Sequence, residues 1–224
     1  MADLPINQII HGDCLDVMKD WPGGCVDLVL ADPPYGIGEK WVGGKGHGWG
    51  QTDTEKTVRN EWDNVPPTQD TILSVCRVSE AQIIWGGNYF VLPPSRCWLL
   101  WIKPERGFTL AEAEMAWTSF DAVVRVKELP RHIAIRQHPT EKPLALMLWC
   151  LENYSKPADL ILYPFCGSGT TCVAAKMLGR NYIGIDISAE YCEIARKRLE
   201  AVDTGVPVKE RDKGQIPLFG VTDA

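Results

Sequence analysis

Apolar residues along the chain fall into two kinds of pattern. Short, nearly continuous apolar runs predict strands that are buried on both faces, as in a parallel sheet. Strands are predicted over residues 7–13, 25–35, 81–87, 97–103, 113–120, 122–129, 159–165 and 181–187, and 25–35 is more continuously apolar than 7–13. Helices are predicted over 14–21, over 68–79, and from Pro143 onward, where apolar residues recur at spacings of three and four. The stripe that follows Pro143 consists of Leu144, Met147, Leu148 and Leu151. The runs 113–120 and 122–129 are expected to pair with each other.

The last third of the chain has the clearest order of elements. Strand 159–165 leads through a glycine-rich turn into a helix over 170–178, which Gly179 ends, and strand 181–187 follows. Ser188 then caps a helix with one apolar face formed by Tyr191, Ala195, Leu199 and Val202. Alternating strands and helices predict a parallel sheet, so the fold class is α/β.

Length and composition favour one domain. The chain has 224 residues and a net charge of -6, and we expect a single domain over 1–204 with a flexible tail over 205–224. The glycine-rich stretch 36–67 has no sustained period and is predicted to be a loop insertion, and a small region at about 104–137 is expected to contact the target. No apolar run reaches the length of a membrane span and no secretory signal is present, which predicts a cytoplasmic protein. The cysteines and histidines show no metal-ligand spacing, so no metal site is expected.

The turn CGSGTT, residues 166–171, permits a close approach of the backbone to a bound molecule. A P-loop would have lysine after Gly169, but Thr170 stands there, and a dinucleotide fingerprint would have glycine in place of Cys172. A methyltransferase cofactor loop is the third possibility. Asp186 ends the next strand about 20 residues later, where a carboxylate can bind a ribose diol. Asp186 could instead belong only to the helix cap.

The stretch Asp32, Pro33, Pro34 and Tyr35 follows another apolar strand. The lone pair of a nucleobase amino group is delocalised into the ring, so an enzyme that methylates this nitrogen must localise the lone pair. Asp32 and the Pro33 carbonyl can each accept one N–H of such an amino group. Tyr35 offers a ring on which an extruded base can stack. The plainer alternative is a strand end followed by a Pro-Pro turn.

With these motifs the chain resembles the S-adenosylmethionine-dependent DNA amino-methyltransferases that act on adenine N6 or cytosine N4. The order Asp-Pro-Pro-Tyr, then HPTEKP (138–143), then PFCGSGTT (164–171) is similar to the permuted beta group. The resemblance implies a Rossmann-like methyltransferase fold, circularly permuted: a doubly wound, mostly parallel seven-stranded sheet with one antiparallel strand. It also implies catalytic roles for Asp32, Pro33, Pro34 and Tyr35 and S-adenosylmethionine as cofactor. The cofactor-binding residues it implies are Asp13, Cys14, His138, Thr140, Lys142, Phe165, Gly167, Ser168, Gly169, Thr170, Thr171 and Asp186.

Permutation predicts that strand 7–13 lies beside strand 181–187, which brings Asp13 to the cofactor's adenine and the two chain ends together. Lys142 could contact the methionine end of the cofactor or could be a solvated charge before Pro143. One departure from the family pattern is Tyr163, where an aspartate usually precedes Pro164 and Phe165. A phenol offers no full charge to the cofactor's amino group.

The expected activity is methyl transfer to adenine N6 in double-stranded DNA, because family enzymes specific for cytosine N4 more often carry serine at the position of Asp32. Cytosine N4 methylation, a catalytically silent DNA-binding homologue, and an N-methyltransferase of small molecules or proteins remain alternatives. Residues 123–142 carry five basic and two acidic side chains, a local difference of +3 that could face DNA. The loop residues Lys40, Lys45, Lys56 and Arg59 could contact phosphates or be solvated. We also expect a homodimer, because one chain this short leaves little room for a recognition domain.

Overall fold

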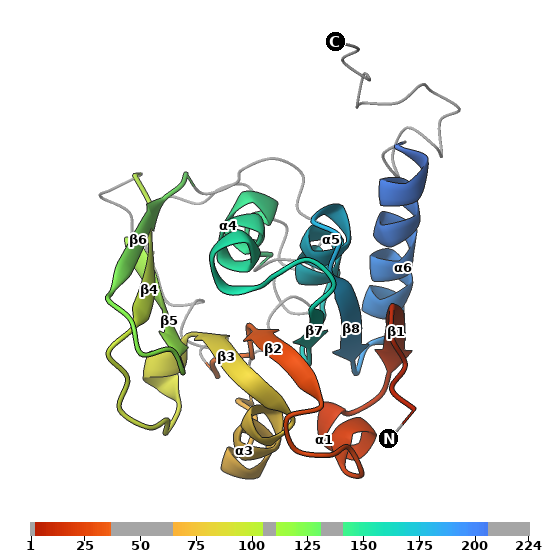
Figure 1. Cartoon of the computed structure of the whole chain (residues 1–224), viewed down its shortest axis with the longest axis horizontal. Coiled ribbons are helices and arrows are strands. Elements are labelled where there is room, and N and C mark those ends of the chain that lie inside the picture. Colours follow the sequence, from red (N-terminus) through yellow and green to blue (C-terminus); the bar gives the residue numbers. More distant parts are fainter. Residues whose placement is uncertain (1–2, 37–64, 105–110, 131–140, 206–224) are drawn as a thin grey trace, which may run out of the picture.

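The computed structural model describes residues 3–36, 65–104, 111–130 and 141–205. Within these residues the chain forms one mostly parallel sheet of eight strands between two layers of helices (Figure 1). The spatial order of the strands is β1 (Gln8–His11), β8 (Asn181–Asp186), β7 (Leu160–Tyr163), β2 (Val26–Ala31), β3 (Ser79–Trp85), β5 (Ala113–Thr118), β4 (Trp98–Ile102) and β6 (Arg125–Glu128). Strand β5 is antiparallel to both of its neighbours, and the other pairs are parallel.

The α/β class, the doubly wound sheet and its single antiparallel strand are therefore confirmed, with two corrections. The described part of the sheet has eight strands where seven were expected. The expected pairing of runs 113–120 and 122–129 is wrong, because β4 lies between β5 and β6. Both edges of β5 are already hydrogen-bonded, to β3 and to β4, so β6 adds to the free edge of β4 instead.

Each central strand sends alternate side chains to opposite faces of the sheet. Leu28 and Leu30 of β2 pack in the core under the helices α4 (Leu144–Tyr154), α5 (Thr170–Met177) and α6 (Ala189–Thr204). Val29 and Ala31 of the same strand pack on the other side, against α1 (Cys14–Met18) and α3 (Gln69–Arg77). A strand covered on both faces buries nearly every position, in β2 all except Asp27, and this explains the nearly continuous apolar run in the sequence.

Helices α3 and α6 begin directly after a capping side chain, whereas α1 ends at Met18, short of the predicted end at residue 21. The Ser188 hydroxyl accepts the Tyr191 N–H at the start of α6, and Thr68 caps α3 in the same way. The apolar stripe predicted on α4 is confirmed. Met147 and Leu151 are fully buried, whereas Leu144 and Leu148 are only partly buried against the same core, so the buried face is centred on the side of Met147 and Leu151. None of the helices in the described ranges has the length and apolar character needed to cross a membrane.

The first and last strands of the described chain meet at one edge of the sheet, as permutation predicts. Strand β1 pairs in parallel with β8, so that His11 lies opposite Asp186, and α6 packs near β1 (Figure 1). The carboxyl ends of β1, β8, β7 and β2 therefore lie side by side. In open α/β sheets this edge is where ligands bind.

Candidate active site

A cleft of about 450 Å³ opens at the carboxyl ends of these strands. It brings together two motifs that lie far apart in the sequence, the glycine-rich turn after β7 and Asp32 after β2. Its lining includes the following predicted site residues: Asp13, Cys14, Asp32, Pro34, Lys142, Phe165, Gly167, Ser168, Thr170 and Asp186. The turn and Asp32 therefore face one cleft although they lie far apart in the sequence.

Glycines shape the turn between β7 and α5 in different ways. Gly167 and Gly169 both have positive φ, at 50° and 81°. A Cβ at Gly169 would lie 2.7 Å from the Cβ of Ala195, so this glycine also allows α6 to pack against the start of α5. Gly169 and the fully buried Thr171 do not line the cleft, unlike their neighbours Gly167 and Thr170.

Asp186 holds this turn in place through both carboxylate oxygens. Its Oδ2 accepts the Gly167 N–H at 2.6 Å, and its Oδ1 accepts the Ser188 N–H at 2.9 Å. Asp186 supports the N-terminus of α6, as a capping residue would, and it also lines the cleft, where a ribose could bind. Ribose binding stays a prediction. Asp13 has a similar double position: it caps α1 by accepting the Leu15 N–H at 2.7 Å and lines the cleft from the β1 side.

Asp32 lies in a buried ion pair with Lys142. The Lys142 ammonium donates to both Asp32 oxygens, at 2.7 and 2.8 Å, and the Tyr35 hydroxyl donates to Oδ1 at 2.7 Å. The Lys142 side chain is only 5% exposed, so it is not a solvated charge. The segment HPTEKP thereby contributes its lysine to the Asp-Pro-Pro-Tyr motif.

Two residues of neighbouring strands extend this ion pair into the sheet. Glu114 of β5 lies with its Oε2 3.1 Å from Lys142 Nζ, and its Oε1 accepts a hydrogen bond from Lys103, which follows β4. Burial alone would raise the pKa of Glu114, but the Lys142 and Lys103 ammonium groups lower it to about 2. Sequence reasoning missed Glu114 and Lys103, because the strand pattern indicates which face a residue lies on but not which charge it meets there.

Burial also governs the pKa values of the groups at the centre of the site. Burial raises the pKa of the Asp32 carboxyl, while Lys142 and Tyr35 act in the opposite direction. Burial opposes the charged form of Lys142, yet the Asp32 and Glu114 carboxylates outweigh it and hold the pKa of Lys142 above its ordinary value. Burial and the same two carboxylates raise the pKa of Tyr35 well above its ordinary value. Tyr35 therefore remains a neutral hydrogen-bond donor to Asp32.

The ring of Tyr35 packs between neighbours that fix its orientation. It stacks on Tyr89 of the 3-10 helix η3 (Gly87–Tyr89), with ring centroids 4.9 Å apart and an interplanar angle of 13°. A Cβ on Gly86 would lie 2.1 Å from Tyr35 Cε1, so only glycine fits there. Tyr35 does not line the cleft, and neither does Pro33. The observed role of Tyr35 is to orient Asp32, and base stacking stays a prediction.

Substitution of Gly86 by alanine is expected to displace Tyr35 from Asp32. Gly86 has a φ of 66°, and the new methyl group would overlap the Tyr35 ring. We expect the free energy of unfolding to fall by about 1–3 kcal/mol from strain and overpacking. Any activity that depends on Asp32 should fall further than this loss of folded protein explains. Urea unfolding and steady-state kinetics on the folded variant measure the two effects.

Gly179→Ala is the matched control for this substitution. Gly179 has nearly the same φ, 68°, but no atom lies within 4 Å of the position of its Cβ. It should therefore show the backbone strain without the loss of activity. Equal activity in the two variants would contradict a role for the packing of Tyr35 on Gly86.

A second polar cluster ties the glycine-rich turn to α6 and to the segment before α4. Arg198 donates to the Ser168 carbonyl and hydroxyl, at 2.8 and 2.7 Å, and forms an ion pair with Glu141 at 2.7 Å. The Thr170 hydroxyl donates to Glu141 at 2.9 Å. Sequence reasoning did not find Arg198, which carries no local signal on the polar face of a helix.

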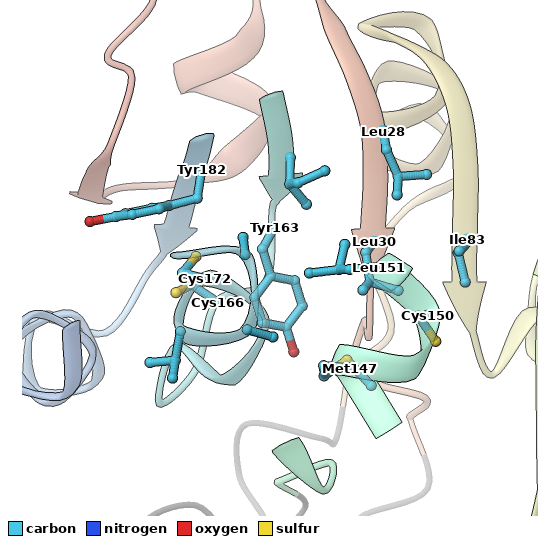
Figure 2. Packing of buried hydrophobic residues seen from close by; sticks show 14 of the residues in the cluster. Leu28, Leu30, Ile83, Met147, Cys150, Leu151, Tyr163, Cys166, Cys172 and Tyr182 are labelled. Atoms are coloured by element: carbon cyan, nitrogen blue, oxygen red, sulfur yellow. The ribbon is translucent and has the colours of Figure 1, made fainter. Parts of the chain in front are cut away.

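Tyr163, the departure from the family pattern, belongs to both the core and the cleft. Figure 2 shows its ring among Leu30, Leu151, Met147 and Cys166, and it is 7% exposed. Burial, together with the Asp32 carboxylate, raises the pKa of Tyr163 well above its ordinary value. The phenol is therefore neutral and cannot replace an aspartate as a charged partner.

Several predicted contacts lie outside the described residues. These are His138 and Thr140, most of loop 36–67 with its four basic residues, and part of the region 104–137. Within the described residues no group of three histidine, cysteine or acidic side chains is placed to hold a metal ion.

Comparison with known proteins identifies the family. The DNA methylase family model N6_N4_Mtase matches residues 84–197. The chain is similar to YubD of Escherichia coli (strain K12), with 31% identity over 215 residues, 88% of this chain and 92% of that protein. It is also similar to the type II methyltransferase M2.MboI of Moraxella bovis, with 27% identity over 250 residues, 87% of this chain and 88% of that protein. The protein belongs to the N6/N4 DNA methylase family and is a DNA methyltransferase.

The fold is shared with solved structures. The crystal structure of the M1.HpyAVI–S-adenosylmethionine complex superposes with a TM-score of 0.56 at 23% identity and covers 86% of this chain and 98% of that one. That complex contains S-adenosylmethionine, the cofactor that the sequence motifs lead us to expect.

The residues of the cleft fit this cofactor. Asp13 and Asp186 offer carboxylate oxygens that suit ribose hydroxyls or an amino group, and Phe165 offers an apolar surface. Asp13, Asp32, Glu141 and Asp186 also give the lining more negative than positive charge, which favours a ligand that carries a sulfonium cation. A volume of about 450 Å³ lies within the range of small-molecule sites.

Proposed function

We propose that this DNA methyltransferase transfers a methyl group to the N6 amino group of adenine in double-stranded DNA. The supporting observation is that Asp32 and the glycine-rich turn line one cleft. The choice of adenine rests on the aspartate at position 32, because the resemblance associates serine at this position more often with cytosine N4.

The proposed mechanism needs only hydrogen-bond acceptors and positioning from the chain. Asp32 accepts one N–H of the target amino group, and the Pro33 carbonyl accepts the other, which localises the nitrogen lone pair. The bound cofactor supplies an electrophilic methyl group, so no side chain has to form a covalent intermediate. As the new N–C bond forms, the bond between the methyl group and sulfur breaks and its electron pair stays on sulfur, which leaves as a neutral thioether. The nitrogen then releases one proton, for which the Asp32 carboxylate is an available acceptor.

A base that enters this site also needs an aromatic surface. Tyr35 is the proposed surface, but Tyr89 already stacks on its ring. Tyr89 is 51% exposed, so it can move aside at a small cost in buried area. In the proposed complex the extruded base takes the place of Tyr89 against Tyr35.

Two alternatives make different predictions about products. The family model includes enzymes specific for cytosine N4, and the same pair of acceptors suits that amino group equally well. A silent DNA-binding homologue is favoured only by Tyr163. The intact hydrogen bonds among Asp32, Tyr35 and Lys142 argue against it.

Product analysis tests the proposal directly. The protein is incubated with methyl-tritiated S-adenosylmethionine and genomic DNA from a bacterial strain without DNA methyltransferases, and the DNA is digested to nucleosides. We expect the label in N6-methyldeoxyadenosine, and none in RNA under the same conditions. Label in N4-methyldeoxycytidine would replace adenine by cytosine as the target, and unlabelled DNA would favour the silent homologue. Light scattering of the protein with and without a DNA duplex tests the expected homodimer.

A further inference from the structure

A row of four alternating charges runs from the cleft into the sheet. It begins at Asp32, continues through Lys142 and Glu114, and ends at Lys103. The exposed fractions of these side chains are 12%, 5%, 22% and 8%, in the same order. Buried charges are costly unless they are paired, so each member depends on its neighbours.

Lys142 poses a problem for the chemistry at Asp32. Its ammonium contacts both oxygens that the target amino group would use. It also neutralises the charge of the carboxylate, and this charge is what would stabilise the positive charge that develops on the attacking nitrogen. An isolated Asp32–Lys142 pair would therefore be a poor acceptor for the substrate.

Glu114 offers a solution, because it gives Lys142 a second anionic partner. An ammonium group has three N–H donors, and Glu114 Oε2 lies 3.1 Å from it on the side of β5. Lys142 can keep a buried ion pair with Glu114 when one Asp32 oxygen turns to the substrate. The negative charge of Glu114 also compensates the positive charge of Lys142.

We propose that Glu114 is a positioning residue, which holds Lys142 and thereby leaves the Asp32 carboxylate able to bind the target amino group and stabilise its positive charge. The inference rests on the proposed transfer to an amino nitrogen at Asp32. It applies equally whether the base is adenine or cytosine.

The pH dependence of activity distinguishes this role from a purely structural one. The charged and titratable groups around Asp32 are Lys142, Tyr35, Glu114 and Tyr163. Asp32 must be ionised to accept an N–H, so activity falls as the pH drops through its pKa. Burial raises that pKa and the charge of Glu114 adds to the rise. Removing this charge lowers the pKa, so the acid limb of the kcat profile moves to lower pH.

The experiment compares Glu114→Gln with Lys103→Met. Both substitutions remove the ion pair between Glu114 and Lys103. Only Glu114→Gln also removes the second carboxylate that contacts Lys142. We expect kcat of E114Q to fall about ten-fold, less than the ~100-fold or more that loss of a direct electrostatic contact costs. The KM of E114Q for S-adenosylmethionine should remain within about three-fold of the wild-type KM. The kcat of K103M should likewise remain within about three-fold of the wild-type kcat. Urea unfolding of both variants measures their stability.

The outcomes separate the two proposals. A ten-fold loss confined to E114Q, with its acid limb at lower pH, supports the role of Glu114. Wild-type kcat in E114Q, equal losses in both variants, or an unmoved acid limb would overturn it. The product formed by the wild type tests the proposed function separately, because a cytosine product would overturn adenine specificity and still allow the comparison of E114Q with K103M.

Discussion

Substitution of Asp32 by asparagine should lower kcat about 1,000-fold while the affinity for S-adenosylmethionine stays within about three-fold. An amide has the shape of the carboxylate but carries no negative charge, so it neither stabilises a positive nitrogen nor accepts its proton. The Lys142 ammonium would then meet a neutral group on one side and Glu114 on the other. Steady-state tritium transfer to unmethylated genomic DNA measures kcat, and titration calorimetry measures cofactor binding.

Asp121→Asn is the matched control for the Asp32 variant. Asp121 forms an ion pair with Arg96, but both side chains are about 80% exposed, and such pairs contribute little. Its kcat should stay within about two-fold of the wild-type value. If D32N kept a tenth or more of the wild-type kcat while it remained folded, Asp32 would not be the acceptor for the target amino group.

The sequence predicted the central strands well because burial on both faces leaves a strong signal, as in β2 and β7. Apolar runs identified every strand of the described sheet, and the glycines and caps marked where helices begin and end. The apolar pattern could not predict which strand β6 pairs with. Its run is compatible with pairing to β5, and only the three-dimensional arrangement shows that both edges of β5 are taken.

The candidate site was predictable to the extent that its residues lie in motifs. Asp32 and Gly167 follow a parallel strand and Asp186 ends one, and the carboxyl ends of such strands meet at one edge. Glu114 and Arg198 lie inside a strand and a helix, and their partners are distant in sequence. An isolated charge in a regular element is usually solvated, so nothing local distinguishes these two from surface residues.

Substitution of Lys142 by methionine should give the largest loss of stability, about 3–5 kcal/mol at pH 7. It leaves Asp32 buried without a cation and Glu114 with Lys103 alone. Methionine has a similar length and is apolar, so the loss reports the charge more than the volume. Urea unfolding followed by circular dichroism measures the free energy of unfolding.

The loss should depend on pH with a definite sign. In the wild type the ammonium groups lower the pKa of Glu114 from 4.5 to about 2, against the effect of burial. The stabilisation from this shift is present above pH 4.5 and is lost as the pH falls toward 2. Without Lys142 the carboxyls of Asp32 and Glu114 bind protons at higher pH. Protonation removes the free-energy cost of burying their negative charges. The difference between K142M and the wild type should therefore shrink as the pH is lowered from 7 to about 3.

Lys176→Met is the control that separates this effect from the general loss of an ion pair. Lys176 pairs with Asp203, whose side chain is 61% exposed, at a distance of 2.6 Å. This more solvated pair should contribute about 1 kcal/mol or less. If K142M and K176M lost equal stability, or if the loss in K142M did not change with pH, the Asp32–Lys142–Glu114 cluster would not be a buried charge network. The protein would then have to position Asp32 by packing alone, through Tyr35, Tyr89 and Gly86.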